Sequence, residues 1–370
     1  MLIQPYLEKM VQQDASDLFI TVGRPPSAKI NGEMTALDEN VLDNQASIDL
    51  VHSTMNAAQK QEFEQTKECN YAIAVDGVGR FRCNAFIQRE QTGMVIRKIN
   101  TTIPDVDKMG MPSVLKDVIM AKRGLFLYVG ATGTGKSTAL AALMGYRNRN
   151  SRGHILTIED PIEFVHQHEK SIVTQREVGV DTESFDAALK SSLRQAPDVI
   201  MIGEVRSAET MEYALSFAET GHLCVATLHA NNANQAIDRI MHMVPKDMKE
   251  KLLFDLSLNL RAIVAQQLVP TKDGNGRVAA IEILLNSPLI SDLIARNELG
   301  GIKEVMEKSK ELGMQTFDGA LFDLYEKGVI TFADALHHAD SPNDLRLKIK
   351  LRSNEQNSSG SLHGVTVDFD

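Results

Sequence analysis

Residues 124–138 read GLFLYVGATGTGKST, an apolar run that leads directly into a glycine-rich loop. The loop fits the pattern G-x-x-x-x-G-K-[ST], whose glycines let successive backbone N–H groups curl around phosphate oxygens. In such a loop Lys136 reaches the β and γ phosphates, and Ser137 offers its hydroxyl to Mg²⁺. We therefore predict a strand, a phosphate-binding loop and a helix, with the loop built by Gly130, Thr132, Gly133, Thr134, Gly135, Lys136, Ser137 and Thr138.

After this loop, short β-rich runs alternate with amphipathic helical patterns. One helix is expected over residues 208–220, because Ser207 stands at the N-cap position and Gly221 ends the pattern. The alternation predicts an α/β domain whose parallel sheet is covered by helices on both faces. The runs are HILTIED (154–160), DVIMIGE (198–204), HLCVATLHA (222–230) and RVAAIEILL (277–285).

Acidic residues follow two of these runs. TIEDPIE (157–163) contains Glu159, Asp160 and Glu163, and the run 198–204 ends in Glu204. Because the carboxyl ends of parallel strands share one edge, these acids should lie beside Lys136 and Ser137. We expect Glu204 to reach Mg²⁺ or its water ligands and Glu163 to act as the base that orients water, with Glu159 and Asp160 bonding the turn backbone and the metal's waters. Solvated surface acids are the competing interpretation.

Two histidines bracket the run 222–230. His229 follows it at the carboxyl end, where ligands bind, so we expect it to hydrogen-bond to phosphate or to a catalytic acid. His222 stands at the other end, where a structural bond to a neighbouring element is the simpler expectation.

Residues 1–100 read as a smaller α+β domain. Asn31-Gly32 stands between two β-rich runs, where a tight hairpin turn needs positive φ. In RFRCNA (80–85) apolar residues alternate with polar ones, which predicts a strand with an arginine-bearing face. We expect a linker over 101–112, a second domain over 113–352 and a polar, disordered tail over 353–370.

Composition argues against several classes of protein. A net charge of −10 and a pI near 5.5 make direct binding of nucleic acid unexpected. The three cysteines form no C-x-x-C pair, so we expect no zinc site and a reducing, cytoplasmic compartment. No apolar run approaches the roughly 18 residues of a membrane span, so any membrane contact should be peripheral.

Four segments, GATGTGKST, TIEDPIEF, SSLRQAPDVIMIGEVR and TGHLCVATLHANNA, occur in this order. Together they resemble the Walker A, Asp, Walker B and His boxes of the hexameric ATPases of secretion systems and type IV pili. ASDLFITVGRPPSAKINGEM and GRFRCNAFIQR extend the resemblance over nearly the whole chain except the tail. The extra N-terminal domain and four-cysteine zinc loop of the assembly ATPases are not seen, so the chain resembles the PilT/PilU-like retraction branch, and within it the PilU type.

The resemblance implies a PAS-like N-terminal domain, a RecA-like ATPase domain and a homo-hexamer that uses ATP and Mg²⁺. It places the ring in the cytoplasm, peripheral to the inner membrane at the pilus base, with the inner-membrane platform protein and the PilT paralogue as partners. It implies pilus retraction, in twitching motility and DNA uptake. It also carries over Lys136, Glu163, Glu204, His222 and His229 as nucleotide-site residues and makes Arg82 and Arg97 candidates for contacting the γ-phosphate. Arginines that only solubilise the strand are the alternative.

Two other functions use the same loop. One is a nucleotide-gated accessory partner of the PilT motor with little activity of its own. The PilT-type segment AIRNLIRE is altered here to LISDLIARNE (289–298), which leaves autonomous retraction open. A small-molecule kinase would need an acceptor pocket and a lid, and the sequence shows neither pattern.

Overall fold

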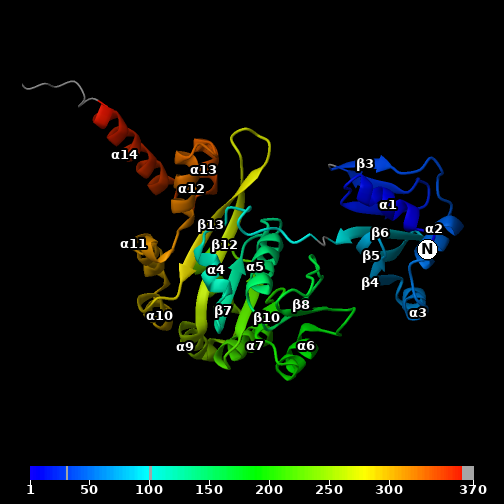
Figure 1. Ribbon diagram of the computed structural model, residues 1–370, viewed down its shortest axis with the longest axis horizontal. Helices are drawn as coiled ribbons and strands as arrows, with labels where there is room; N and C mark the ends of the chain where they lie inside the picture. The colour runs from blue at the N-terminus through cyan, green and yellow to red at the C-terminus, as the bar shows by residue number, and fades with distance from the viewer. Residues whose placement is uncertain (31, 100–101, 361–370) are drawn as a thin grey trace, which may run out of the picture.

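The structure is a computed structural model that describes residues 1–30, 32–99 and 102–360, with side chains through Arg352. Figure 1 shows two bodies, each built around one β-sheet. Within these described ranges, no helix combines the length and the apolar character needed to cross a bilayer.

The N-terminal body holds a six-stranded sheet of order β3-β2-β1-β6-β5-β4, in which every neighbouring pair is antiparallel. The predicted hairpin is confirmed, because Ile30 pairs with Glu33 and Gly32 has a φ of +88°. Asn31, the other turn residue, lies outside the described residues. The elements are α1 (Gln4–Gln12), β1 (Asp17–Ile20), β2 (Ser27–Ile30), β3 (Glu33–Ala36), α2 (Asn44–His52), α3 (Ala57–Thr66), β4 (Glu68–Val75), β5 (Gly79–Gln88) and β6 (Gln91–Ile99).

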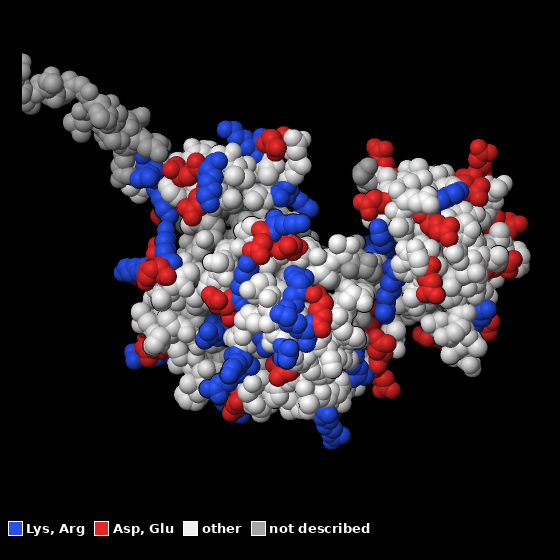
Figure 2. All heavy atoms as spheres, in the orientation of Figure 1, with Lys and Arg blue, Asp and Glu red and all other residues white. Residues whose placement is uncertain are grey.

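Strand β5 shows the predicted alternation of faces. Phe81, Cys83 and Ala85 are fully buried, whereas Arg80, Arg82 and Asn84, which alternate with them, are half-buried on the opposite face. Arg82 stands directly opposite Arg97 of β6, so the two strands together form the arginine-bearing face. In Figure 2 basic side chains gather on the side of the smaller body that faces the larger one.

The larger body holds a seven-stranded sheet of order β13-β12-β7-β11-β10-β8-β9. All neighbours are parallel except β12 and β13, which form an antiparallel pair at one edge. The prediction of a parallel sheet is therefore confirmed for the central strands and wrong for the run 277–285. The strands are β7 (Gly124–Val129), β8 (His154–Glu159), β9 (Ile172–Glu177), β10 (Val199–Ile202), β11 (Leu223–Leu228), β12 (Leu260–Pro270) and β13 (Arg277–Leu285).

Helices cover both faces of this sheet, and the side chains of β7 show why. Leu125, Leu127 and Val129 pack in one apolar cluster with α6, α7, α8 and α9, while Phe126 and Tyr128 pack in another with α4 and α5. A strand buried on both faces needs a continuous apolar run, which is what residues 124–129 supply. The helices are α4 (Val114–Ile119), α5 (Lys136–Asn150), α6 (Phe185–Ser192), α7 (Ala208–Glu219), α8 (Ala233–Met243) and α9 (Lys249–Asn259). As predicted, Ser207 caps α7 by accepting a hydrogen bond from the backbone N–H of Thr210.

The chain ends in a group of helices, the last of which extends away from the body (Figure 1). Helix α14 is anchored by the buried Leu345 and Ile349 and continues to Gly360. The backbone of residues 353–360 thus continues the helix, the expectation of disorder from residue 353 stays a prediction, and residues 361–370 lie outside the described residues. These helices are α10 (Pro288–Ala295), α11 (Ile302–Lys308), α12 (Phe317–Glu326), α13 (Phe332–His338) and α14 (Pro342–Gly360), with short 3₁₀ turns η1 (Leu193–Gln195), η2 (Lys246–Met248), η3 (Leu299–Gly301) and η4 (Lys310–Leu312).

Candidate functional site

The glycine-rich loop connects the carboxyl end of β7 to the first turn of α5. Two of its glycines leave no room for a side chain. A Cβ on Gly130 would lie 2.7 Å from the carbonyl oxygen of Gln266, and a Cβ on Gly135 would lie 2.9 Å from the Nε2 atom of the same residue. Gly135 also has a φ of +84°, which L-residues with side chains rarely adopt.

Gln266, from β12, braces this loop and was not predicted. Its Nε2 donates a hydrogen bond of 2.7 Å to the carbonyl of Thr134, and its Oε1 accepts one from the hydroxyl of Tyr128. The side chain is almost completely buried, so these bonds hold the loop from behind. The sequence offers one indication of this role, a pair of polar glutamines inside the otherwise apolar run 260–270.

Lys136 lies over the loop that carries it. Its Nζ donates hydrogen bonds of 2.7 Å to the carbonyl of Gly130 and 2.8 Å to that of Ala131. Burial lowers the pKa of Lys136, and the negative charges of Glu204 and Glu163 oppose that shift. Both acids thus act on the lysine that is expected to meet the phosphates.

The predicted acids converge on this loop. The hydroxyl of Ser137 donates a hydrogen bond of 2.9 Å to Oε1 of Glu163. Glu204 uses both carboxylate oxygens: Oε2 lies 2.7 Å from Nη2 of Arg206, and Oε1 lies 3.3 Å from Nε2 of His229. The structure therefore brings the ends of β8, β10 and β11 to one place, as the parallel topology requires.

Glu159 occupies a different environment from the one expected. It is buried, and its Oε1 accepts hydrogen bonds from the Thr157 hydroxyl at 2.6 Å and the Gln175 amide at 3.1 Å. Burial raises its pKa to about 7, although these two hydrogen bonds work in the opposite direction. The expected bond to the turn backbone comes instead from Glu177, whose Oε2 accepts from the N–H of Ile162 at 3.2 Å. The assignment of Glu159 to the turn backbone was thus wrong, because β9 supplies an acid that the sequence analysis did not place.

These groups line a cavity of about 650 Å³, which is within the range of ordinary ligand pockets. Arg206 and Arg277 also line it, and neither was predicted. Arg206 lies 3.7 Å from Asp160 in addition to its contact with Glu204. The predicted residues on the wall are Thr132, Gly133, Gly135, Lys136, Ser137, Thr138, Glu159, Asp160, Glu163, Glu204 and His229.

His222 does not approach this cavity within the chain. Its Nδ1 lies 3.2 Å from the carbonyl of Phe217 and 3.2 Å from the hydroxyl of Thr220, at the end of α7. It precedes β11, so it stands at the opposite edge of the parallel sheet from His229. The nucleotide role that the resemblance carried over to His222 therefore stays a prediction.

Arg82 and Arg97 are not on the wall of this cavity either. The Nε of Arg97 donates a hydrogen bond of 2.8 Å to Asp17, and the guanidinium side chain remains 71% exposed. The charge of Arg82 acts on Glu177 of β9. Burial raises the pKa of Glu177, and the charges of Arg80 and Arg82 oppose that rise. The γ-phosphate role of the two arginines therefore stays a prediction.

The side chains around Ser137 fit a magnesium ion. Mg²⁺ is usually held by one or two carboxylates together with substrate phosphates and waters, and it prefers oxygen ligands. The hydroxyl of Ser137 and the carboxylates of Glu163 and Glu204 supply oxygen donors at the phosphate loop. Nitrogen and sulfur ligands, which other divalent metals favour, are represented on this wall by the histidines His166 and His229 and by the thioether of Met201.

Known proteins resemble this chain over most of its length. The family model described as type II/IV secretion system protein matches residues 1–310. The type IV pilus ATPase PilU of Pseudomonas aeruginosa is 58% identical over 365 residues, which cover 98% of this chain and 96% of that protein. The pilus retraction ATPase PilT of the same organism is 41% identical, over 90% of this chain and 96% of its own length.

A solved structure extends the comparison to the fold. The crystal structure of the pilus retraction motor PilT with bound ADP matches with a TM-score of 0.87 at 40% identity, over 93% of this chain and 98% of that one. The predicted α/β architecture, a RecA-like P-loop domain with a smaller PAS-like N-terminal domain, is confirmed. The chain belongs to the type II/IV secretion system protein family, in its PilT/PilU-like branch of ATPases.

Proposed function

We propose that this chain hydrolyses ATP with Mg²⁺ and uses the reaction to drive or assist type IV pilus retraction. The observation that carries the proposal is the convergence of Lys136, Ser137, Glu163, Glu204 and His229 on one cavity at the carboxyl edge of the sheet. A phosphate-binding loop without neighbouring acids would bind a nucleotide but would supply no group for its hydrolysis. The acids beside it supply the groups that hydrolysis needs.

The chain's own residues divide the work as follows. The backbone N–H groups of the loop bind the phosphates, and Lys136 exchanges its contacts with the carbonyls of Gly130 and Ala131 for phosphate oxygens. Glu163 orients the attacking water and accepts its proton. Glu204 is held from both sides by Arg206 and His229, so its carboxylate is preorganised.

Two of these side chains, Ser137 and Glu204, are placed where they could bind Mg²⁺. Ser137 would hold Mg²⁺ directly and Glu204 would hold it through water. When bound, Mg²⁺ neutralises charge on the phosphate oxygens.

We propose that the active form is a homo-hexamer at the cytoplasmic side of the inner membrane, at the pilus base. The arginine-bearing face of β5 and β6 supports this assembly, because Arg82 and Arg97 do not line the cavity of their own chain. A neighbouring subunit can bring such a face over a nucleotide, and arginines supplied in this way stabilise the charge that develops on the γ-phosphate. The pilus platform protein is the proposed partner in force transmission.

The second candidate is an accessory partner of the PilT paralogue. The altered segment 289–298 favours this candidate over a motor that works alone. The relative named as a retraction ATPase, PilT, is also less similar to this chain than PilU, at 41% against 58% identity. An accessory role still needs nucleotide binding, so both candidates use the same cavity.

Pilus retraction in living cells tests the proposal. Cells that lack the gene are complemented with the parent chain, with Glu204→Gln, or with Glu212→Gln, whose side chain is exposed on α7. We expect the parent and Glu212→Gln to restore twitching and the force of retraction, and Glu204→Gln to fail. Repeating the comparison without the paralogue separates the candidates, since only a self-sufficient motor restores movement there. Equal restoration by Glu204→Gln would contradict the proposal.

A further inference from the structure

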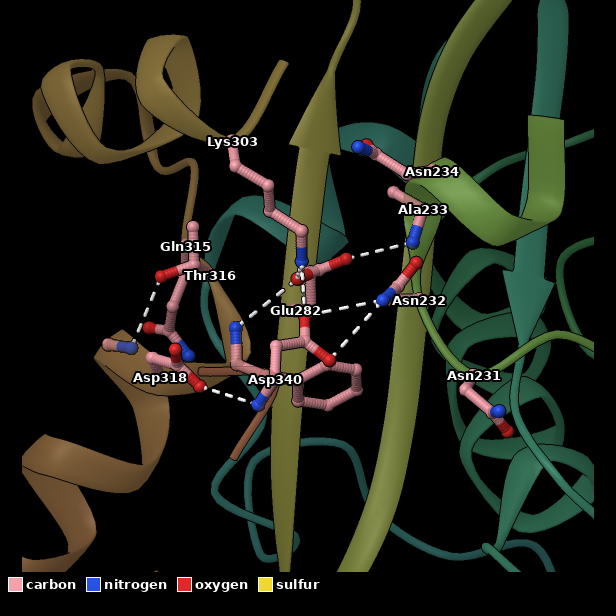
Figure 3. Close-up of polar contacts among 12 residues, drawn as sticks. Asn231, Asn232, Ala233, Asn234, Glu282, Lys303, Gln315, Thr316, Asp318 and Asp340 are labelled. Carbon is pink, nitrogen blue, oxygen red and sulfur yellow. Dashed lines mark hydrogen bonds and ion pairs between the residues drawn. The ribbon is translucent and has the colours of Figure 1, made fainter. Parts of the chain in front are cut away.

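A cluster of charged side chains lies between β13, α8 and the C-terminal helices (Figure 3). Its centre is Glu282 of β13, which is completely buried. Oε1 of Glu282 accepts a hydrogen bond of 2.8 Å from the backbone N–H of Ala233, the first residue of α8. Oε2 accepts one of 3.3 Å from the N–H of Phe317, at the start of α12, and pairs with Lys303 of α11.

Lys303 extends the cluster to a second carboxylate. Its Nζ lies 2.6 Å from Oδ2 of Asp340, in the segment between α13 and α14. Asp340 in turn accepts hydrogen bonds of 3.3 Å from the side-chain amide of Asn232. Asn232 is the N-cap of α8, because its Oδ1 accepts from the N–H of Gln235 at 2.9 Å. The start of α8 is therefore held twice, by Glu282 through the backbone and by Asp340 through the cap.

The charges of this cluster depend on one another. Burial raises the pKa of Glu282, and the charge of Lys303 opposes that rise. Burial also acts to lower the pKa of Lys303, but Glu282 and Asp340 outweigh it and raise that pKa above its usual value. A buried ion pair of this kind costs desolvation and is weak support for stability by itself, whereas removing one partner leaves an uncompensated charge. The contacts of the cluster therefore matter for where they hold the start of α8.

The positioned segment leads straight to the nucleotide cavity. Strand β11 ends at Leu228 and α8 begins at Ala233, so His229 is separated from the held residues only by residues 230–231. His229 lies 3.3 Å from Glu204. A displacement of the start of α8 therefore reaches that contact directly, whereas Lys136 and its loop are carried by other elements, β7 and α5.

We propose that Glu282, Lys303 and Asp340 form a positioning cluster that holds His229 against Glu204, so that the C-terminal helices α11 to α14 set the geometry of the hydrolysis site. The inference rests on the proposed hydrolysis of ATP. It makes the three residues positioning residues, which do not touch the nucleotide. It also gives a route by which a partner that moves the C-terminal helices could change turnover without entering the cavity.

Lys303→Met in the full-length chain tests the inference, with Lys303→Arg as the conservative rescue. Lys308→Met is the matched control, because Lys308 is an exposed lysine of the same helix whose partner, Glu304, is also exposed. We expect Lys303→Met to lower kcat about 5- to 30-fold and to leave the KM for ATP within about twofold. Lys303→Arg should recover most of the loss, and Lys308→Met should match the parent.

A double mutant separates positioning from general damage. In a His229→Ala background, Lys303→Met should cause no further loss of kcat, because the contact it positions is already gone. If the two losses simply multiply, or if KM rises as much as kcat falls, the positioning role is refuted. Should Lys303→Met fail to fold, Asp340→Asn takes its place, since it removes one charge and leaves the pair between Glu282 and Lys303.

A readout that needs no turnover keeps this test distinct from the proposed function. Amide hydrogen exchange over residues 229–235, in the nucleotide-free protein, should be faster in Lys303→Met than in the parent and unchanged in Lys308→Met. Absence of hydrolysis by the parent would overturn the proposed function. Unchanged exchange in Lys303→Met would overturn the positioning cluster, whether or not the parent hydrolyses ATP.

Discussion

Replacing Glu204 by glutamine perturbs the cavity at its most constrained acid. The carboxylate is 17% exposed, and its oxygens lie 2.7 Å from Arg206 and 3.3 Å from His229. Glutamine keeps the shape but carries no negative charge and has one acceptor oxygen in place of two, so it cannot form the ion pair with Arg206. The change therefore removes a charge-assisted contact and, with it, the fixed orientation of the side chain.

The size of the effect follows from what the acid does in the reaction. Loss of a positioned acid or base slows the chemical step by about 10²–10⁴-fold. At about 1.36 kcal/mol for each factor of ten, this corresponds to about 2.7–5.4 kcal/mol of lost transition-state stabilisation. Nucleotide affinity should change little, because Lys136 and the loop amides are untouched.

Single-turnover hydrolysis and nucleotide affinity, measured on the same preparations, separate these quantities. Glu163→Gln should behave like Glu204→Gln, while Glu212→Gln, at an exposed position on α7, should behave like the parent. The reasoning is refuted for either acid whose replacement leaves the single-turnover rate within about threefold of the parent, a change of less than about 0.7 kcal/mol.

Further perturbations address other parts of the molecule. Lys136→Ala removes the ammonium from the phosphate loop, a charged contact worth about 1.5–3 kcal/mol, so hydrolysis at saturating ATP should fall at least about tenfold; near-normal turnover would mean that the loop is not the site. Burial raises the pKa of Glu159 from its usual 4.5 to about 7, so the folded state holds a proton that the unfolded chain has lost, and this residue lowers the free energy of unfolding as pH rises between those values. Glu159→Gln should therefore gain in Tm relative to the parent as pH rises from about 4.5 to about 7, and a difference that is flat with pH would refute this. Truncation after Arg352 leaves the buried anchors Leu345 and Ile349 in place, so Tm and turnover should hardly change, and a fall in Tm of several degrees would show packing beyond that point. Arg82→Ala and Arg97→Ala should lower turnover far more than affinity while sedimentation still shows hexamers, and parental rates in those hexamers would make both arginines surface residues.

The central part of the fold was predictable because it rests on strong local patterns. A fully apolar run such as residues 124–129 followed by G-x-x-x-x-G-K-S specifies a buried strand, a phosphate loop and a helix. Parallel topology then brings Glu163, Glu204 and His229 to one edge, since each follows a strand of the same direction. Ser207 and Gly221 likewise fixed the ends of α7 through well-understood capping.

What the sequence analysis missed depends on contacts between distant segments. Strand β9 reads IVTQRE, and only its pairing with β8 makes it a strand, so Glu177 could not be placed at the turn. The apolar run of β12 was visible, but that Gln266 braces the loop depends on β12 lying beside β7. The role of Glu282, a buried acid in the middle of β13, could not be predicted either. It depends on Lys303, which pairs with both Glu282 and Asp340 and comes from a distant segment.

Phosphate release by the purified full-length chain, with and without the PilT paralogue, tests the central claim most directly. The account predicts ATP hydrolysis that requires Mg²⁺, disappears on chelation, and is lost in Lys136→Ala and in Glu204→Gln but kept in Glu212→Gln. A self-sufficient motor shows this activity alone, and an accessory partner shows it when mixed with the paralogue carrying an inactive site. If no release that depends on Lys136 and Glu204 is found in either mixture, the cavity is not a hydrolysis site and the account is wrong.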